Sequence, residues 1–306
     1  MNFSLTAVTV LTLMAFAVPG YLLIRFKAVK EEGISYFAKL LLFVCQPCLS
    51  LYSFNKADYS RELFADMSLF FALSALLEAV MLGALFLIFR KRYANPSLRV
   101  VTVAAAFGNV GFLGVPLLEA LLPDHPDAVA FSAVFIVAMN LMAWTLGSTL
   151  LTGDKKYISL KKLVLNPPVL ILFVALPLFF TGTKLPSAVD NFVTLLARMT
   201  TPLCMIILGM RLATVSPKEL FSSYESYLAA ALKLVAFPFI AYLLVVFLPV
   251  EEYVKQVMFI LACCPTASVV LNLAEIYGVG QKPAAFSVLT STIFSMITIP
   301  LLLLIL

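Results

Sequence analysis

The sequence predicts an all-α integral membrane protein whose ten spanning helices form two halves of opposite orientation. Three observations support this fold class. Hydrophobic residues make up 62% of the 306 residues and charged residues only 12%, whereas about a quarter of a soluble domain is charged. Long apolar stretches alternate with turn residues and charge clusters. In each half, one apolar stretch contains proline with asparagine, glycine or hydroxyl residues, a combination that an uninterrupted spanning helix avoids.

Ten apolar stretches approach or exceed the roughly 20 residues that cross a hydrocarbon core of about 30 Å. They run over Ser4–Arg25, Ile34–Phe54, Leu63–Phe89, Leu98–Leu122, Ala128–Leu151, Pro167–Thr181, Ala188–Leu212, Tyr227–Leu248, Val254–Tyr277 and Pro283–Leu306. The sixth is short for a spanning helix. The first is too long for the apolar part of a signal peptide, so we expect it to be retained.

Basic residues are distributed unevenly between alternate loops. Fifteen of the 21 Lys and Arg residues lie in or beside the odd-numbered loops, and four lie in or beside the even-numbered ones. Because cytoplasmic loops retain Lys and Arg, we expect the odd loops inside and both termini outside the cytoplasm. This distribution explains the net charge of +5 without a nucleic-acid partner. The basic tract Lys155–Lys162 is better explained as a signal that keeps this loop in the cytoplasm than as a lipid-binding site.

Ten spans divide into five and five. We expect residues 1–151 to form the first half, residues 152–166 a basic cytoplasmic linker and residues 167–306 the second half. An odd number of spans per half inverts the second half relative to the first. The prolines support an internal repeat, because Pro19, Pro47 and Pro116 match Pro177, Pro202 and Pro265 in spans one, two and four against six, seven and nine.

The interrupted stretches are Ala104–Ala120, which contains GNVGFLGVP, and Leu261–Gly278, which contains CCPTASVVLN. A proline leaves a backbone carbonyl without its helical partner, so we expect Pro116 and Pro265 to break their helices. Paired interruptions in two halves point to a transporter's binding site. The N–H end of a broken helix carries about half a positive charge and receives carboxylates, whereas carbonyl ends suit cations. A small organic anion is therefore the natural ligand.

The candidate substrate-binding residues lie in these two stretches. They are Gly108, Asn109, Gly111, Pro116, Pro265, Thr266, Ser268 and Asn272. Asn109 offers an amide donor and acceptor to the ligand or to freed backbone groups. The spacing of Gly108, Gly111 and Gly114 fits a helix break and a close helix-packing face equally well.

Three charged residues, Glu78, Arg198 and Lys233, lie deep in predicted spans. Charge at the bilayer centre costs at least about 2.5–3.5 kcal/mol on insertion scales, so such residues usually face a cavity or a partner. Glu78 is the leading coupling candidate; its alternatives are an ion pair with Lys233 or a hydrogen bond with Asn140. Lys233 could attract an anion, pair with Glu78 or extend to the membrane surface. Arg198 has no evident partner in the sequence.

The run from Gly108 to Leu117 resembles the fourth-helix motif of the auxin efflux carrier family, and Asn166–Pro168, Leu208–Gly209 and Tyr277–Gly278 resemble further family patterns. The resemblance covers essentially the whole chain. It implies two inverted five-helix repeats, similar to the sodium/proton antiporter and bile-acid transporter folds, in which helices four and nine break and cross. One position departs from the family: Val269 stands where an asparagine is common.

The resemblance also implies a division of labour between the helices. Helices one, two, six and seven would form a scaffold, often dimeric, and helices three to five and eight to ten a transport domain that moves like an elevator. The family includes plant auxin carriers and bacterial permeases for organic acids. We therefore expect the substrate to be an auxin-like monocarboxylate or a dicarboxylate.

The predicted function is a secondary carrier of a small organic anion in the plasma membrane. The alternative is a symporter or antiporter coupled to H⁺ or Na⁺ through Glu78; a passive channel is a further class. No catalytic pair, HExxH motif or nucleotide-binding motif occurs, so neither an enzyme nor an ATP-driven pump is expected. The five cysteines lie in spans, and His125 is the single histidine. We expect neither a cofactor nor a bound metal.

Overall fold

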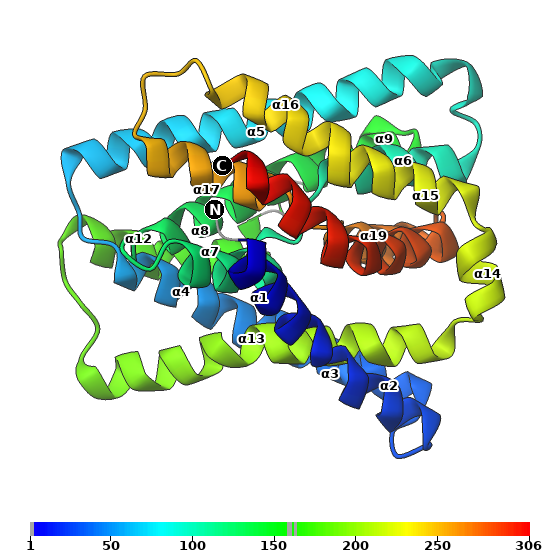
Figure 1. Cartoon of the computed structure of the whole chain (residues 1–306), viewed down its shortest axis with the longest axis horizontal. Helices are drawn as coiled ribbons and strands as arrows, with labels where there is room; N and C mark the ends of the chain where they lie inside the picture. The colour runs from blue at the N-terminus through cyan, green and yellow to red at the C-terminus, as the bar shows by residue number, and fades with distance from the viewer. Residues whose placement is uncertain (1–2, 158–160, 162–163) are drawn as a thin grey trace.

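The computed structural model describes residues 3–157, 161 and 164–306, and this part of the chain is helical throughout, with no β-strand. Most long helices run side by side along the longest axis, and their connections gather at the two ends (Figure 1). Within these described residues, seven helices are long and apolar enough to cross a membrane: Phe3–Arg25, Glu31–Lys56, Arg61–Arg92, Ala128–Thr152, Ser187–Thr214, Tyr224–Val245 and Gln281–Ile305. The expected class, an all-α membrane protein, is confirmed.

Several of these seven helices contain a short irregular turn. The first consists of α1 (Phe3–Ala15) and α2 (Ala17–Arg25); the second of α3 (Ile34–Leu40) and α4 (Gln46–Lys56), joined by a π-helical turn. The others contain α5 (Arg61–Phe89), α8 (Ala128–Met142) with α9 (Ser148–Thr152), α13 (Ser187–Thr214), α15 (Tyr224–Ala231) with α16 (Phe237–Val245), and α19 (Gln281–Leu302). The short helix α14 (Pro217–Ser222) connects α13 to α15.

The other three expected spans are shorter or broken. The fourth consists of α6 (Pro96–Ala106), a π-helical turn (Val110–Gly114) and α7 (Val115–Leu121); the sixth of α11 (Pro167–Leu170) and α12 (Leu172–Phe180); the ninth of α17 (Glu252–Ala262) and α18 (Val269–Tyr277). Helices α6 and α17 have 11 residues each. At 1.5 Å per residue each covers about 16 Å, roughly half of a hydrocarbon core.

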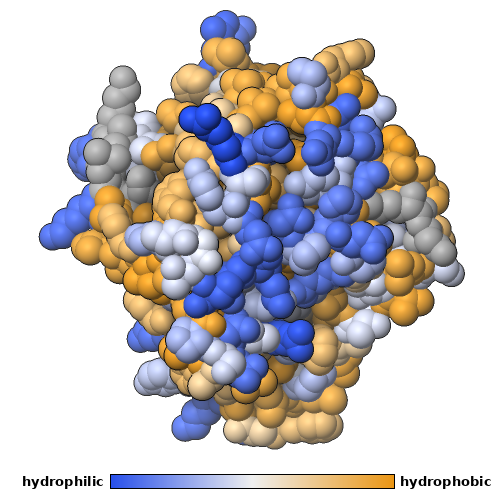
Figure 2. Space-filling model, turned by 90° about the vertical axis from the view of Figure 1, so that its left-hand side faces the viewer, coloured by the Kyte–Doolittle hydropathy of each residue, from blue (hydrophilic) through white to orange (hydrophobic). Residues whose placement is uncertain are grey.

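Three of the odd-numbered loops lie together at one end, and three of the even-numbered loops lie at the other. Residues 26–30, 93–95 and 215–223 are at the right of Figure 1, and residues 57–60, 182–186 and 246–251 are at the left. We call the right-hand end, with Lys27, Lys30 and Lys218, the basic end. Figure 2 shows the opposite end, where a band of polar residues runs between apolar flanks. Exposed apolar side chains such as Phe43, Leu195 and Phe239 cover the helices between the ends, as contact with lipid requires.

Helices α2 and α13 are in direct backbone contact. A Cβ atom on Gly20 would overlap the carbonyl oxygen of Ile206, and one on Gly209 would overlap that of Ala17. Small residues at these two positions let the helices approach closely, as is common between membrane helices. Helix α13 packs against α2 and α4, and α12 packs against α4, whereas α1 packs mainly against α19. Helices α5, α6, α8, α15, α16, α17 and α19 pack mainly among themselves.

Candidate functional site

The two interrupted stretches meet and cross. The helix is interrupted at residues 107–109 in the first and at residues 263–268 in the second. Gly108 and Thr266 form an antiparallel bridge. The N–H of Asn109 donates to the carbonyl of Pro265 over 2.7 Å, and the N–H of Ala267 donates to the carbonyl of Phe107 over 2.9 Å. The expectation of two broken helices that meet is confirmed, and we call this contact the crossing.

Only one of the two prolines is at its break. Pro265 lies within the non-helical segment, but Pro116 is in the first turn of α7, after the break at residues 107–109. The prediction that Pro116 breaks the fourth span is therefore wrong. The π-helical turn Val110–Gly114 runs directly into α7, so the missing N–H of Pro116 leaves the carbonyl of Phe112 without an α-helical partner. That carbonyl accepts a hydrogen bond of 2.7 Å from the hydroxyl of Thr201 on α13.

Buried hydroxyls satisfy further backbone groups of the broken helices. Ser132 of α8 donates to the carbonyl of Val110 over 2.7 Å. Thr266 donates through its hydroxyl to the carbonyl of Ala104 over 3.0 Å, and its N–H donates to the hydroxyl of Ser291 on α19 over 3.1 Å. Sequence reasoning did not single out Ser132 or Ser291. The available signal was a hydroxyl within an apolar span, which needs a partner when buried.

A cavity of about 1290 Å³ extends from the crossing toward the basic end. Its deep part is lined by Gly108, Asn109, Gly111, Ser268 and Val269. The polar residues of its walls are Ser35, Gln46, Asn140, Asn166, Asn272 and Thr292, and the charged residues around its mouth are Glu31, Glu32, Lys39, Lys161, Arg211 and Glu275. The cavity exceeds the 300–1,000 Å³ that is usual for a ligand pocket, so it has room for a solute and its water.

The deep part of the cavity combines an amide with two helix starts. Asn109 is 8% exposed and contacts the thiol of Cys204 on α13. Gly111 belongs to the first turn after one break, and Ser268 and Val269 begin α18 after the other. The first N–H groups of a helix have no intrahelical partners and carry partial positive charge. This arrangement can receive a carboxylate.

The three glycines of the first stretch have different surroundings. Gly108 is in the crossing itself, where an added Cβ atom would lie 3.0 Å from the Nζ atom of Lys233. A Cβ atom on Gly111 would lie 2.9 Å from Ile136, and one on Gly114 would lie 2.5 Å from Leu261. Gly108 therefore serves the break, whereas Gly111 and Gly114 serve close packing, so both expected roles are present.

Lys233 reaches the crossing from the π-helical turn Leu232–Ala236, between α15 and α16. Its side chain is fully buried, so it does not extend to the membrane surface. Its Nζ atom donates to the carbonyl of Ala262, the last residue of α17, over 3.2 Å. The same atom lies 3.6 Å from the centroid of the Phe237 ring, a cation–π distance.

Glu78 of α5 is also fully buried, and neither of its carboxyl oxygens has a hydrogen-bond partner in the described part of the chain. It interacts electrostatically with Lys233 but forms no ion pair with it. The side-chain amide of Asn140 instead donates to the carbonyl of Ile136 over 2.8 Å and accepts from Asn166 over 2.6 Å. A direct partnership of Glu78 with Lys233 or Asn140, which the sequence left open, is therefore wrong.

Polar contacts also join α4 to α7 of the first broken helix. Tyr52 of α4 donates to Glu119 of α7 over 2.6 Å, and the exposed Arg198 also interacts with Tyr52. Arg198 thus has a partner that its sequence context did not reveal. Glu275, by contrast, is at the cavity mouth and pairs with Arg211 over 3.3 Å.

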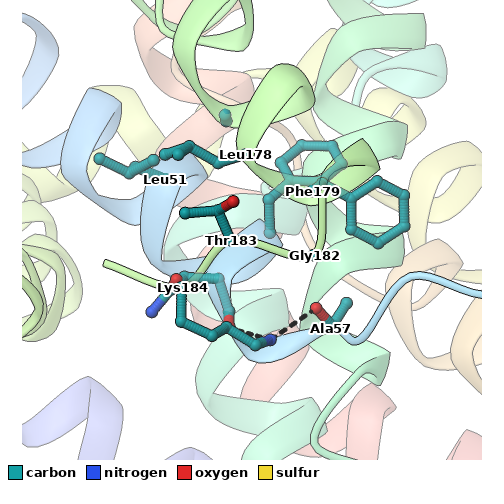
Figure 3. Close-up of a pocket in the computed structure, with 10 residues that line it drawn as sticks. Leu51, Ala57, Leu178, Phe179, Gly182, Thr183 and Lys184 are labelled. Atoms are coloured by element: carbon teal, nitrogen blue, oxygen red, sulfur yellow. Dashed lines mark hydrogen bonds between the residues drawn. The ribbon is translucent and has the colours of Figure 1, made fainter. Parts of the chain in front are cut away.

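A second pocket, near the end opposite the basic end, has a volume of only about 10 Å³ (Figure 3). This is room for about one water molecule. Beside it, the Nζ atom of Lys184 donates to the carbonyls of Asn55 and Ala57, over 2.8 Å each, at the end of α4. It also pairs with Asp58 over 2.8 Å. This pocket is too small for an organic solute.

Of the sequence-predicted residues, Gly108, Asn109, Gly111, Ser268, Asn272 and Asn140 line the large cavity. Thr266 and Pro265 hold the crossing together behind it, and Pro116 lies farther along α7. Within the described residues, no group of three His, Cys, Asp or Glu residues is arranged to hold a metal ion. The tract Lys155–Lys162 includes residues 158–160 and 162, which lie outside the described residues.

These features define a membrane transport protein. A family model described as "Membrane transport protein" matches residues 5–160 and 156–303, which together cover nearly the whole chain. The chain therefore belongs to this family, which is the auxin efflux carrier family that its fourth-helix motif resembles.

Individual relatives match over similar lengths. An uncharacterized transporter of Methanocaldococcus jannaschii is 25% identical over 95% of this chain and 96% of its own length. A Rhizobium meliloti protein named "Putative malonate transporter" is 24% identical over 92% of this chain and 89% of its own. The uncharacterized transporter YfdV of Escherichia coli is 24% identical over 92% of this chain and 91% of its own.

Proposed function

We propose that this protein is a secondary carrier that moves a small organic anion across the plasma membrane by alternating access. The observation that carries the proposal is the convergence of Asn109 with two helix starts at the closed end of a cavity. A carboxylate placed there meets partial positive charge and hydrogen-bond donors in a site of low dielectric, where both are stronger than in water.

The chemistry of the cavity supports a carboxylate substrate with an apolar part. The polar residues that line the deep part of the cavity contribute neutral amides and hydroxyls, and apolar side chains such as Phe112, Ile136 and Met139 line it as well. One relative is named for malonate, which is a dicarboxylate. Auxin-like monocarboxylates and dicarboxylates both belong to the proposed class.

The proposed architecture has ten spans in two inverted repeats, residues 1–151 and 167–306, joined by the linker 152–166. Spans one, two, six and seven form the scaffold, and the others form the transport domain. The packing of α2 and α4 against α13, and of α12 against α4, supports this grouping. With the basic end in the cytoplasm, both termini are outside and the cavity faces inward. A homodimer through the scaffold helices belongs to the same proposal.

An elevator motion requires contacts between scaffold and transport domain that can exchange. Among the described residues, contacts of this kind include Thr201 to Phe112, Tyr52 to Glu119 and Arg211 to Glu275. A bifunctional thiol reagent that links Tyr52→Cys to Glu119→Cys, in a background without the native cysteines, should stop transport reversibly. Undiminished transport by the linked protein would contradict the motion.

Coupling to H⁺ or Na⁺ through Glu78 is the second candidate. The observation that favours it is the fully buried carboxyl group of Glu78, whose oxygens have no hydrogen-bond partner in the described structure. Burying such a group without a partner is unfavourable, and charged or ionisable residues within a membrane are usually functional.

The proposed function is tested with purified protein. Thermal stability is first screened against a panel of mono- and dicarboxylates, and the acids that stabilise the protein are then used in proteoliposomes. We expect saturable uptake and counterflow of at least one acid. Accumulation of the acid driven by a gradient of pH or Na⁺ would identify the protein as an ion-coupled carrier. Non-saturable flux of every acid would identify a channel instead.

A further inference from the structure

We propose that the ammonium group of Lys233 is a built-in cation, which occupies the carbonyl end of α17 where an exchangeable metal cation would otherwise bind. The contact that carries this proposal is the hydrogen bond of 3.2 Å from Nζ to the carbonyl of Ala262. Ala262 is the last residue of α17, so its carbonyl is at the negative end of the helix dipole. Unwound carbonyls and helix ends at a membrane midplane are suited to cations.

The remaining surroundings of Lys233 fit a fixed cation. Its Nζ atom lies 3.6 Å from the centroid of Phe237, whose ring face attracts positive charge. Its end also adjoins Gly108, where an added Cβ atom would come within 3.0 Å of Nζ and 3.3 Å of Cε. The lysine thus contacts both arms of the crossing: the end of α17 and the break after α6.

No carboxylate neutralises this ammonium directly. Among the side chains that the structure describes, Glu78 and Lys233 are the only buried charged residues, and they form no ion pair. The positive charge of Lys233 therefore adds to that of the helix starts near Asn109. The crossing is positive without a cation taken from solution, which suits an anion-binding site.

A consequence for transport follows, and it rests on the proposed function. Since the carbonyl end of α17 is already occupied by a covalently attached cation, anion transport should not require Na⁺ at this position. The occupancy of the site by Lys233 can be tested without any organic anion. Failure of the proposed function and failure of this inference are therefore distinguishable.

The test measures the melting temperature of purified protein in chloride salts of Na⁺, K⁺, n-propylammonium and choline at equal ionic strength. Lys233→Ala removes the ammonium and leaves space for a small cation. We expect it to melt about 4 °C or more below wild type in choline, the scale for losing a buried cation at a helix C-terminus in a chain of this length. Saturating n-propylammonium or Na⁺ should restore most of this loss, whereas n-propanol should not.

Lys184→Ala is the matched control, since Lys184 also donates to carbonyls at a helix end, but at the surface (Figure 3). We expect its melting temperature to show no preference among the four cations. Lys233→Met, which keeps the length of the side chain without the charge, should be destabilised and should not be rescued by n-propylammonium.

Three results would overturn the proposal. The first is a Lys233→Ala protein as stable as wild type in choline. The second is a destabilised Lys233→Ala protein that responds to no cation. The third applies if Lys233→Ala cannot be purified in NaCl. Solubilisation in n-propylammonium chloride should then recover folded protein, and failure to recover it would contradict the proposal.

Discussion

The backbone N–H of Asn109 lies 2.7 Å from the carbonyl oxygen of Pro265, and this hydrogen bond joins the two broken helices of the protein. The side chain of Asn109 lines the cavity, where it also contacts the thiol of Cys204. The crossing also fixes the position of this amide relative to the start of α18. A preorganised amide beside a helix start is what recognition of a carboxylate requires.

Replacing the Asn109 amide should impair anion binding without unfolding the protein. Asn109→Ala removes a hydrogen bond to a charged ligand, so we expect the affinity for the best-binding acid to fall about tenfold or more and uptake to be lost. Isothermal titration and proteoliposome uptake measure the two effects. Ser35→Ala, at the cavity mouth, is the control and should retain binding. Normal uptake by Asn109→Ala would exclude the assigned role.

The hydrogen bond from Thr201 to the carbonyl of Phe112 should replace the bond that Pro116 cannot donate. Thr201→Val keeps the side-chain shape but removes the donor, so we expect a loss of about 1–3 kcal/mol in stability. Pro116→Ala restores a backbone N–H that can bond to Phe112, and the double variant should regain part of the loss. A double-mutant cycle in thermal unfolding measures this coupling. Strictly additive effects would show that Thr201 does not compensate for the proline.

Glu78 can be tested through the pH dependence of transport. Glu78→Gln keeps the shape of the side chain but cannot exchange a proton, so the pH profile of uptake should change if Glu78 is the coupling site. Uptake is measured between pH 5 and 8, a range chosen around neutral pH. Glu62→Gln is the control, because Glu62 is exposed in the first turn of the same helix and does not line the cavity. An unaltered profile in Glu78→Gln would assign Glu78 a structural role.

The contact between α2 and α13 predicts unequal effects of glycine substitution. Gly20→Ala places a Cβ atom against the carbonyl oxygen of Ile206, and overpacking of this kind costs about 1–3 kcal/mol. Gly83→Ala, in α5, is the matched control, since no atom lies within 4 Å of its added Cβ. Alanine there should be neutral or stabilising by up to about 1 kcal/mol. Equal melting temperatures for the two variants would refute the close contact.

The crossing was predictable because its signals are local. Pro265 lies within its break, and Asn109 is embedded in a run of glycines that no uniform spanning helix would contain. The same local reasoning placed the first break at Pro116. The sequence could not reveal that Gly108 bridges Thr266, which is 158 residues away. Because this pairing sets the position of the break, Pro116 is left within the helical segment Val110–Leu121 that follows it.

The partners of buried polar groups could not be predicted from sequence. The composition of the spans identified Glu78 and Lys233 as unusual and suggested an ion pair between them. In the structure, the ammonium instead bonds to the carbonyl of Ala262, because the end of α17 is exposed by the break beside it. The carbonyl of Phe112, which the missing N–H of Pro116 leaves free, likewise accepts from Thr201. Such contacts depend on how helices pack, which hydropathy does not specify.

We propose above all that the crossing binds the carboxylate of the substrate. The most direct measurement is a cryo-electron microscopy map of the protein with the acid that stabilises it most. We predict carboxylate density within hydrogen-bond distance of the Asn109 amide and the first turn of α18. Density confined to the cavity mouth near Arg211, with the crossing empty, would contradict it.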